Sequence, residues 1–242
     1  MSTIVAATQM GMLDDVERLR IISHNLANVS TVGFKRELAV SSQFEQQVRN
    51  ASSPDGLHGT PSLVGSYTDR SPGALTHTGN PLDLALEGDA WFVVDTGQQE
   101  AYTRQGTLRL DADGQLVTVS GQRVVTTSGD VRLTSAAPTI DAQGNIRDAG
   151  AIIGQLKVVT VANPQSLTET GDGLYVASDS TVTGSADTAR VRQGFTEASN
   201  VISMNEMIKM IESVRHFEAS QKLLQGYDAM LDRAITDLGS VQ

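Results

Sequence analysis

Hydrophobic and polar residues follow a helical period at both ends of this chain and a strand-like period between them. Residues 3–28 contain no proline, and apolar residues recur there at spacings of three, four and seven: Val5, Met12, Val16, Leu19 and Leu26. Asp14, Arg18 and Arg20 lie off this stripe. The pattern predicts one amphipathic helix, roughly 40 Å long at about 1.5 Å per residue.

The end of this helix is marked by residues that accept unusual backbone angles. Asn25 and Asn28 tolerate the left-handed conformation, and Gly33 can take a positive φ without a Cβ clash. We therefore expect the helix to end near Asn28 and the chain to turn at Gly33.

A second helix is predicted to start at Ser203. Ser203-Met204-Asn205-Glu206 has the order of a capping box, in which Ser203 caps the helix and Glu206 reaches back. Positions alternating by three and four then form a mostly apolar stripe: Met207, Met210, Val214, Phe217, Gln221, Leu224, Asp228, Leu231, Ile235 and Leu238. Gln221, Asp228 and the off-stripe Gly226 weaken its middle, so we expect this helix to depend on packing partners.

The middle of the chain contains short β-prone runs separated by turn residues. The runs are Trp91–Val94, Leu116–Val119, Val124–Thr127, Val158–Val161 and Leu174–Val176. Two similar phrases, residues 111–115 (DADGQ) and 141–145 (DAQGN), place Asp first and Gly at the left-handed position of a tight hairpin. These features predict a largely antiparallel β domain.

The predicted fold class is therefore α+β, with long terminal helices paired as a coiled coil and a central, mostly antiparallel β domain. Residues 1–49 would form the N-terminal helix and turn of the helical core, and residues 196–242 its C-terminal helix. Residues 50–62 are rich in Ser, Pro and Gly and are expected to form a linker, and residues 63–195 the β domain.

Composition narrows the function classes. The chain has 242 residues, 39% of them hydrophobic, which is enough to bury a core. Its formal charge of -10 argues against nucleic acid, because affinity for phosphates rests on clustered Lys and Arg. The N-terminus has no basic residues before its short apolar run, so no Sec-type signal is expected, and no run is long enough to span a bilayer.

Catalytic and ligand-binding motifs were sought and not found. The chain has no cysteine, and its four histidines have no metal-ligand spacing, so neither a metal nor another cofactor is expected. Asp111-Ala112-Asp113-Gly114 resembles part of a calcium loop, but with Gly114 at loop position six the first ligand would be Arg109. The phrase is better explained as a hairpin turn.

Four phrases resemble the signatures of flagellar rod and hook axial proteins. They are residues 25–35 (NLANVSTVGFK), 82–89 (LDLALEGD), 102–106 (YTRQG) and 197–201 (EASNV). The chain length suits the intermediate rod proteins of that family. Residues 215–218 (RHFE) and 90–92 (AWF) look more like the proximal, F-type rod branch than the distal, G-type branch.

The resemblance implies a structural subunit and no enzyme. Terminal helices of many copies would pack around an export channel, with the β domain outside, in a shaft that crosses the periplasm in the flagellar basal body and transmits torque. The partners implied are copies of the chain, other rod proteins and the flagellar type III export apparatus. The expected assembly interface comprises Asn25, Leu26, Ala27, Asn28, Gly33, Phe34, Ser199, Asn200, Val201, Met207, Met210, Val214, Arg215, Phe217, Glu218, Leu224 and Leu231.

Two alternatives stay open at this point. One is a distal rod or hook-type homologue. The other is a secreted β-domain enzyme or glycan-binding module with a helical stalk, although one Trp and four Tyr are few aromatic residues for sugar stacking.

On the second helix, Arg215 lies three residues from both Glu212 and Glu218, a spacing that predicts surface ion pairs.

Overall fold

The computed structural model describes residues 2–40, 65–135, 137–163, 166–177, 182–185 and 189–239. The chain forms two compact units. The helical unit comprises residues 1–27, 37–69 and 201–242, and the β unit comprises residues 28–36 and 70–200. Each unit thus combines segments from distant parts of the chain. The linker expected at residues 50–62 lies outside the described residues.

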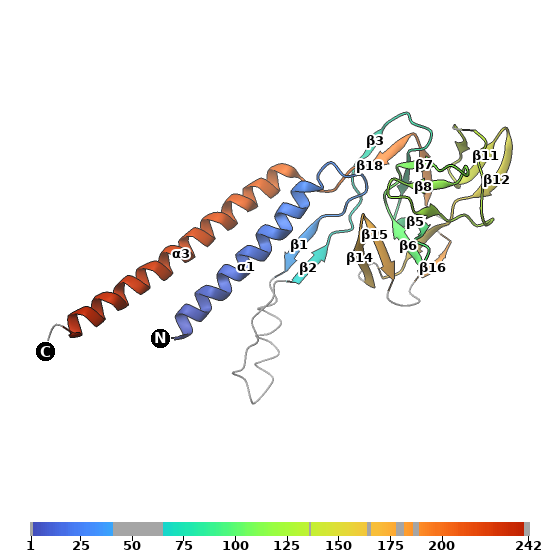
Figure 1. Cartoon of the computed structure of the whole chain (residues 1–242). Helices are drawn as coiled ribbons and strands as arrows, with labels where there is room; N and C mark the ends of the chain where they lie inside the picture. The colour runs from blue at the N-terminus through green and yellow to red at the C-terminus, as the bar shows by residue number, and fades with distance from the viewer. Residues whose placement is uncertain are drawn as a thin grey trace. The chain divides into compact units, whose positions relative to one another are not determined.

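The helical unit is built on two long helices, α1 (Ser2–Ala27) and α3 (Ser203–Gly239). They lie side by side and run in opposite directions, so the start of α1 and the end of α3 share one end of the unit (Figure 1). A two-stranded antiparallel sheet, β1 (Glu37–Val40) with β2 (Gly65–Thr68), lies against α1. Both predicted helices are confirmed.

The buried face of α1 differs from the predicted stripe. Val16 is 52% exposed, whereas Asp14 and Asp15 are buried together with Ile21 and Ile22. The prediction for Val16 and Asp14 is therefore wrong. A carboxylate can lie on the buried face of a helix when it has partners, and Asp15 has partners here, as described below.

The β unit is made of short antiparallel strands. They are β3 (Leu75–His77), β4 (Leu84–Glu87), β5 (Ala90–Asp95), β6 (Glu100–Thr103), β7 (Leu108–Leu110), β8 (Leu116–Thr118), β9 (Arg123–Val124), β10 (Thr139–Ile140), β11 (Asn145–Asp148), β12 (Ala151–Gln155), β13 (Val158–Val161), β14 (Leu167–Gly171), β15 (Leu174–Ala177), β16 (Val182–Ser185), β17 (Arg190–Gln193) and β18 (Phe195–Glu197). All strand pairs of the described residues are antiparallel, which confirms the α+β fold class.

The largest sheet has nine strands. Its path is β14-β15-β6-β5-β9-β8-β7, with β13 paired to both β5 and β16 off this path. A three-stranded sheet, β10-β11-β12, and two pairs, β17-β4 and β18-β3, complete the unit. The central strand β5 is buried along most of its length: Phe92 belongs to one apolar cluster and Trp91 to a second, where its ring meets that of Tyr175 edge to face at 5.1 Å.

The two predicted hairpin turns have the expected geometry. Gly114 and Gly144 have φ of 78° and 81°. Asp111 accepts hydrogen bonds from the backbone N–H groups of Asp113 and Gln115 at 2.9 and 2.8 Å, and the phrase at residues 141–145 repeats the arrangement. The Asp111 carboxylate, which resembled a calcium ligand, therefore holds a turn.

A third aspartate of the β unit links two segments of the chain by hydrogen bonds. Asp148, on β11, accepts hydrogen bonds from the hydroxyl and the backbone N–H of Thr134 at 2.6 and 2.7 Å. These donors hold the pKa of Asp148 below its ordinary value, because they stabilise the ionised carboxylate.

Candidate functional site

Asn25 joins three elements of the helical unit. This fully buried side chain lies near the end of α1, and its amide oxygen accepts from the backbone N–H of Glu37 at 2.8 Å. Its amide nitrogen donates to the backbone carbonyl of Glu37 at 2.7 Å and to the Glu206 carboxylate at 3.3 Å. Asn25 thus pairs with β1 as a neighbouring strand would, and also holds the start of α3.

The start of α3 is confirmed at Ser203, but the capping roles differ from the prediction. The backbone carbonyl of Ile202 accepts from the N–H groups of Asn205 and Glu206, so Ile202 occupies the cap position. The Glu206 side chain turns toward α1, where it meets Asn25, and also accepts from Lys209 at 2.7 Å. The buried carboxylate of Glu206, which is 1% exposed, thus has hydrogen-bond donors.

A second polar contact ties the middle of α3 to α1. His216 Nδ1 lies 2.5 Å from Asp15 Oδ2, and Arg18 Nη1 lies 3.6 Å from Asp15 Oδ1. The Asp15 side chain is 1% exposed, while those of His216 and Arg18 reach solvent. The imidazole of His216 and the guanidinium of Arg18 thus cover one buried carboxylate.

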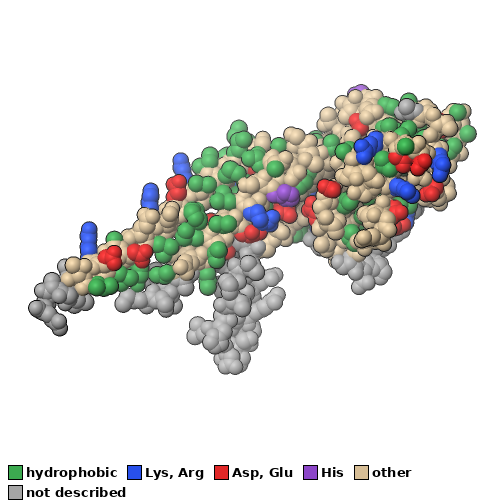
Figure 2. Space-filling view, in the orientation of Figure 1, with side chains coloured by type: hydrophobic (Ala, Val, Ile, Leu, Met, Phe, Trp, Pro, Cys, Tyr) green, Lys and Arg blue, Asp and Glu red, His purple; other side chains and the backbone are tan. Residues whose placement is uncertain are grey.

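The α3 helix presents two different faces. Apart from the half-buried Lys209, its buried and half-buried positions recur by four and three: Glu206, Met210, Ser213, Phe217, Ser220, Leu224, Tyr227 and Leu231. Five large apolar residues are exposed on the other side of the first half of the helix: Met204, Met207, Ile208, Ile211 and Val214. We call these five the exposed stripe. Figure 2 shows hydrophobic side chains open to the surface along the helices.

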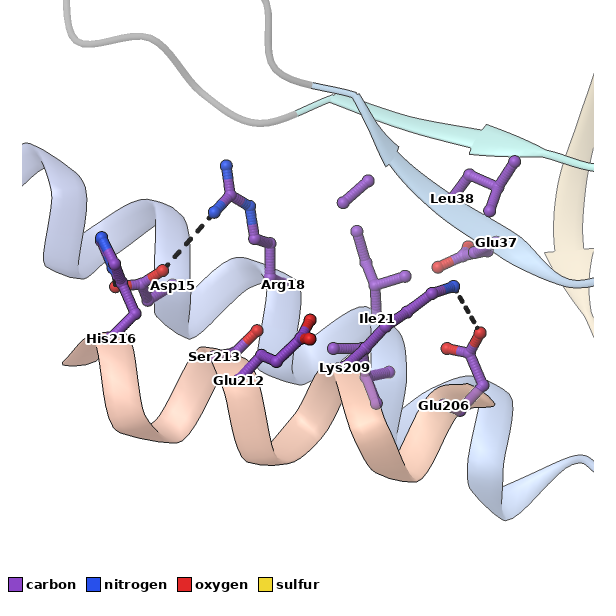
Figure 3. Close-up of a pocket in the computed structure, with 12 residues that line it drawn as sticks. Asp15, Arg18, Ile21, Glu37, Leu38, Glu206, Lys209, Glu212, Ser213 and His216 are labelled. Carbon is purple, nitrogen blue, oxygen red and sulfur yellow. Dashed lines mark hydrogen bonds and ion pairs between the residues drawn. The ribbon is translucent and has the colours of Figure 1, made fainter. Parts of the chain in front are cut away.

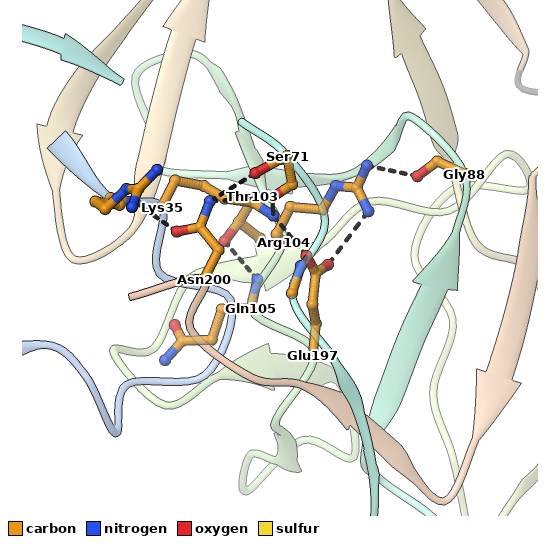
Figure 4. Close-up of polar contacts among 10 residues, drawn as sticks. Lys35, Ser71, Gly88, Thr103, Arg104, Gln105, Glu197 and Asn200 are labelled. Atoms are coloured by element: carbon orange, nitrogen blue, oxygen red, sulfur yellow. Dashed lines mark hydrogen bonds and ion pairs between the residues drawn. The ribbon is translucent and has the colours of Figure 1, made fainter. Parts of the chain in front are cut away.

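The β unit contains a buried charge cluster that the sequence analysis did not identify (Figure 4). The Glu197 carboxylate lies 2.5 Å from Lys35 Nζ and 3.2 Å from Arg104 Nη1, and all three side chains are at most 2% exposed. Lys35 also donates to the carbonyl of Ser71, and Arg104 to that of Gly88. Burial lowers the pKa of Arg104, and the charges of Glu197 and Asp89 oppose that effect.

The turn before Lys35 packs directly on the same cluster. Gly33 has φ of 70°, which confirms the expected positive φ, and its N–H donates to the carbonyl of Glu197 at 2.7 Å. A Cβ at Gly33 would lie 2.7 Å from the backbone of Arg104 and Gln105. Asn200 accepts from the backbone N–H of Arg36 at 2.7 Å. Residues of all four signature phrases therefore meet in the β unit.

The residues expected at an assembly interface occupy different environments. Asn25, Gly33, Phe34 and Val201 are buried; Leu26, Asn28, Ser199, Asn200, Met210, Phe217, Leu224 and Leu231 are half-buried; Ala27, Met207, Val214, Arg215 and Glu218 are exposed. The predicted ion pairs of Arg215 with Glu212 and Glu218 do not form, and Arg215 has no ion pair to any described residue.

The described helices are not long and apolar enough for any of them to cross a membrane. Large apolar side chains exposed along one face of a helix are typical of proteins that contact other proteins.

Comparison with known proteins identifies the family. The model of the flagellar basal body rod FlgEFG protein C-terminal region matches residues 192–237, and that of the flagellar hook protein FlgE/F/G D1 domain matches residues 85–153. The chain is 33% identical to the flagellar basal-body rod protein FlgG of Bacillus subtilis (strain 168), over 93% of this chain and 95% of that protein. It is 34% identical to FlgF of Escherichia coli (strain K12), over 88% and 89%.

The chain belongs to the flagellar basal-body rod protein family. It is a structural protein of the rod in the flagellar basal body, since the family consists of rod proteins and not of enzymes. The resemblance seen in the sequence is confirmed on these grounds.

Proposed function

We propose that this chain polymerises through its terminal helices into the shaft that surrounds the export channel and transmits torque. The observation that carries the proposal is the exposed stripe on α3. Five large apolar side chains, between 39% and 66% exposed, follow one side of the helix for three turns. A helix from a neighbouring subunit would remove them from water.

The size of this contact suits a polymer better than an isolated dimer. Completing the burial of five half-exposed apolar side chains would contribute about 1 kcal/mol each, or roughly 5 kcal/mol. Association costs an estimated 4–15 kcal/mol in lost translational and rotational freedom. One contact of this kind is therefore weak, whereas a subunit held by several neighbours in a helical lattice is stable.

Within the subunit, α1 and α3 would act as a coiled coil. The four-three recurrence of buried positions on α3 supports this pairing, and Ser213 and Ser220 allow the helices to approach closely. The proposed assembly interface then has two parts. Asn25, Phe217, Leu224 and their buried neighbours set the shape of the pair, and the exposed residues Met207, Val214, Arg215 and Glu218 face other subunits.

We assign the chain to the proximal, F-type branch, with other rod proteins as neighbours and the flagellar type III apparatus as its route of export. Residues 215–218 (RHFE) and 90–92 (AWF) support the branch. Relatives of both the F and G types match along most of the chain, so the alternative is a distal rod protein. The position of a tagged copy along isolated basal bodies tests the branch: a tag at the distal end would contradict our assignment.

Ile211→Asp tests the polymer itself. Ile211 is 53% exposed on the stripe, so the substitution should leave the fold of the subunit intact. In a polymer it would bury a charge without a partner, at a cost of several kcal/mol. We expect loss of assembly by the purified chain, measured by light scattering and electron microscopy, and loss of motility in cells that carry only this variant.

Gln225→Asp is the matched control, because Gln225 is an exposed polar residue of the same helix outside the stripe. It should assemble as the unaltered chain does. Normal assembly of Ile211→Asp, with unchanged helix content by circular dichroism, would contradict the proposal.

A further inference from the structure

A notch lies in the helical unit between α1, α3 and β1 (Figure 3). Its volume is about 420 Å³, and four carboxylates line it, those of Asp15, Glu37, Glu206 and Glu212. The fixed cations in its wall are Arg18 and Lys209. The lining therefore has more negative than positive charge.

The basic groups around the notch meet only part of this negative charge. Glu37 Oε2 lies 4.0 Å from Arg20 Nη2 and 3.7 Å from His24 Nδ1, and both distances are too long for a hydrogen bond. Lys209 is engaged by Glu206, and Arg18 approaches Asp15 Oδ1 only to 3.6 Å, beyond hydrogen-bond distance. Asp15 Oδ1 and Glu37 Oε2 are buried oxygen atoms without a hydrogen-bond donor among the described residues. Glu212, at the rim, has no ion pair there either.

Buried acceptors without donors are costly, so a donor that enters the notch would be bound. Among the described residues, no three His, Cys, Asp or Glu side chains are grouped so that they could hold one metal ion. The acceptors lie on separate elements around one space, an arrangement that suits a group with several N–H donors on a long stem. The guanidinium of Arg and the ammonium of Lys are such groups.

The same unit carries basic side chains that have no partner. Arg215, Lys222 and Arg233 form no ion pair with any described residue. They are seven and eleven residues apart, close to two and three turns at 3.6 residues per turn, so they share one side of α3. We call them the basic ridge. The ridge lies about half a turn away from buried Glu206 and Leu224, on the outward side of the helix.

We propose that the notch of one subunit receives a basic side chain from the ridge of a second copy of this chain. This inference rests on the proposed polymerisation and names the charge contact that orients it. Notch and ridge are different patches of the same unit, so the contact is heterologous: each subunit offers its ridge to one neighbour and its notch to another. Contacts of this kind generate open helical polymers when the rotation does not close.

Charge reversal on each side, separately and together, tests the pairing. Glu212→Lys reverses the rim of the notch at an exposed position, and Arg215→Glu with Lys222→Glu reverses the ridge. Each change alone should raise the critical concentration for assembly of the purified full chain by roughly tenfold or more. The combination of all three changes should bring it back toward the unaltered value. Added salt should weaken assembly of the unaltered chain.

Asp232→Lys is the control, since Asp232 is an exposed acid of α3 outside the notch, and circular dichroism verifies the fold of every variant. If the unaltered chain does not assemble, the proposed polymerisation fails, and this inference with it. If the unaltered chain and Glu212→Lys assemble alike, only the notch contact is refuted. Failure of the combined variant to recover, or normal assembly of the ridge variant, would refute the second copy as the occupant.

Discussion

Glu197→Gln is the sharpest test of the buried charge cluster in the β unit. The substitution keeps the shape of the side chain and removes one negative charge that Lys35 approaches at 2.5 Å and Arg104 at 3.2 Å. At an effective dielectric constant of about 20, these distances correspond to gross attractions of about 7 and about 5 kcal/mol. The cost of removing the three groups from water offsets much of this attraction.

The net effect follows from what remains after the substitution. Two buried cations lose their shared carboxylate, and removing one partner of a buried ion pair destabilises by about 3–5 kcal/mol. The chain has a single tryptophan, Trp91, which is 2% exposed in the β unit, so its fluorescence during urea unfolding reports on this unit. We expect the free energy of unfolding to fall by that amount.

Glu100→Gln is the matched control. Glu100 pairs with Lys157 at 2.6 Å in the same unit, but the two side chains are 47% and 35% exposed. A pair of this exposure contributes at most about 1 kcal/mol. If Glu197→Gln proved as mild as the control, the cluster would not hold the signature phrases together, and the reasoning from burial would be refuted.

Three further features can be tested by the same fluorescence assay. Gly33→Ala should destabilise the β unit by about 1–3 kcal/mol, because Gly33 has a positive φ and a Cβ there would collide with the backbone of Arg104. Gly11→Ala, where the Cβ would enter open space on a helix, should not destabilise this unit, and equal effects would contradict the argument. Asp148→Asn should lose stability at neutral pH, and its deficit should shrink as the pH falls below about 4. A lowered folded-state pKa stabilises fully above the unfolded-state pKa, and this stabilisation is lost as the pH falls through the folded-state pKa; a deficit independent of pH would refute the linkage. Asp111→Ala should lower the free energy of unfolding by about 1 kcal/mol, because Asp111 accepts two backbone hydrogen bonds, and Asp113→Ala should lower it less. The reverse order would refute the role of Asp111 in the turn.

The features predictable from sequence are those set by local chemistry. The positive φ of Gly33 and the turns at residues 111–115 and 141–145 each depend on a few consecutive residues. They were correct because glycine conformation and turn hydrogen bonds are decided within a few residues of the chain.

The features that escaped prediction depend on partners far away in sequence. Lys35 and Glu197 are 162 residues apart, and nothing next to either residue indicates that both are buried. Similarly, the predicted apolar stripe of α3 began at Met207, but Met207 is exposed, whereas Glu206 and Ser213 are buried. A small or paired polar residue can occupy a helix contact, and only the tertiary structure supplies its partner.

The way each unit is closed has a consequence for the timing of folding. The helical unit is joined by Asn25 and Glu206, which are 181 residues apart, and the β unit by Lys35 and Glu197. Contacts of such sequence separation form slowly, because a long loop must close before they contribute. A chain that stops short of Glu197 lacks α3 and the shared carboxylate, so neither unit can complete its fold. Incomplete products would remain open to proteases, and protease resistance would be acquired only when nearly the whole chain is present.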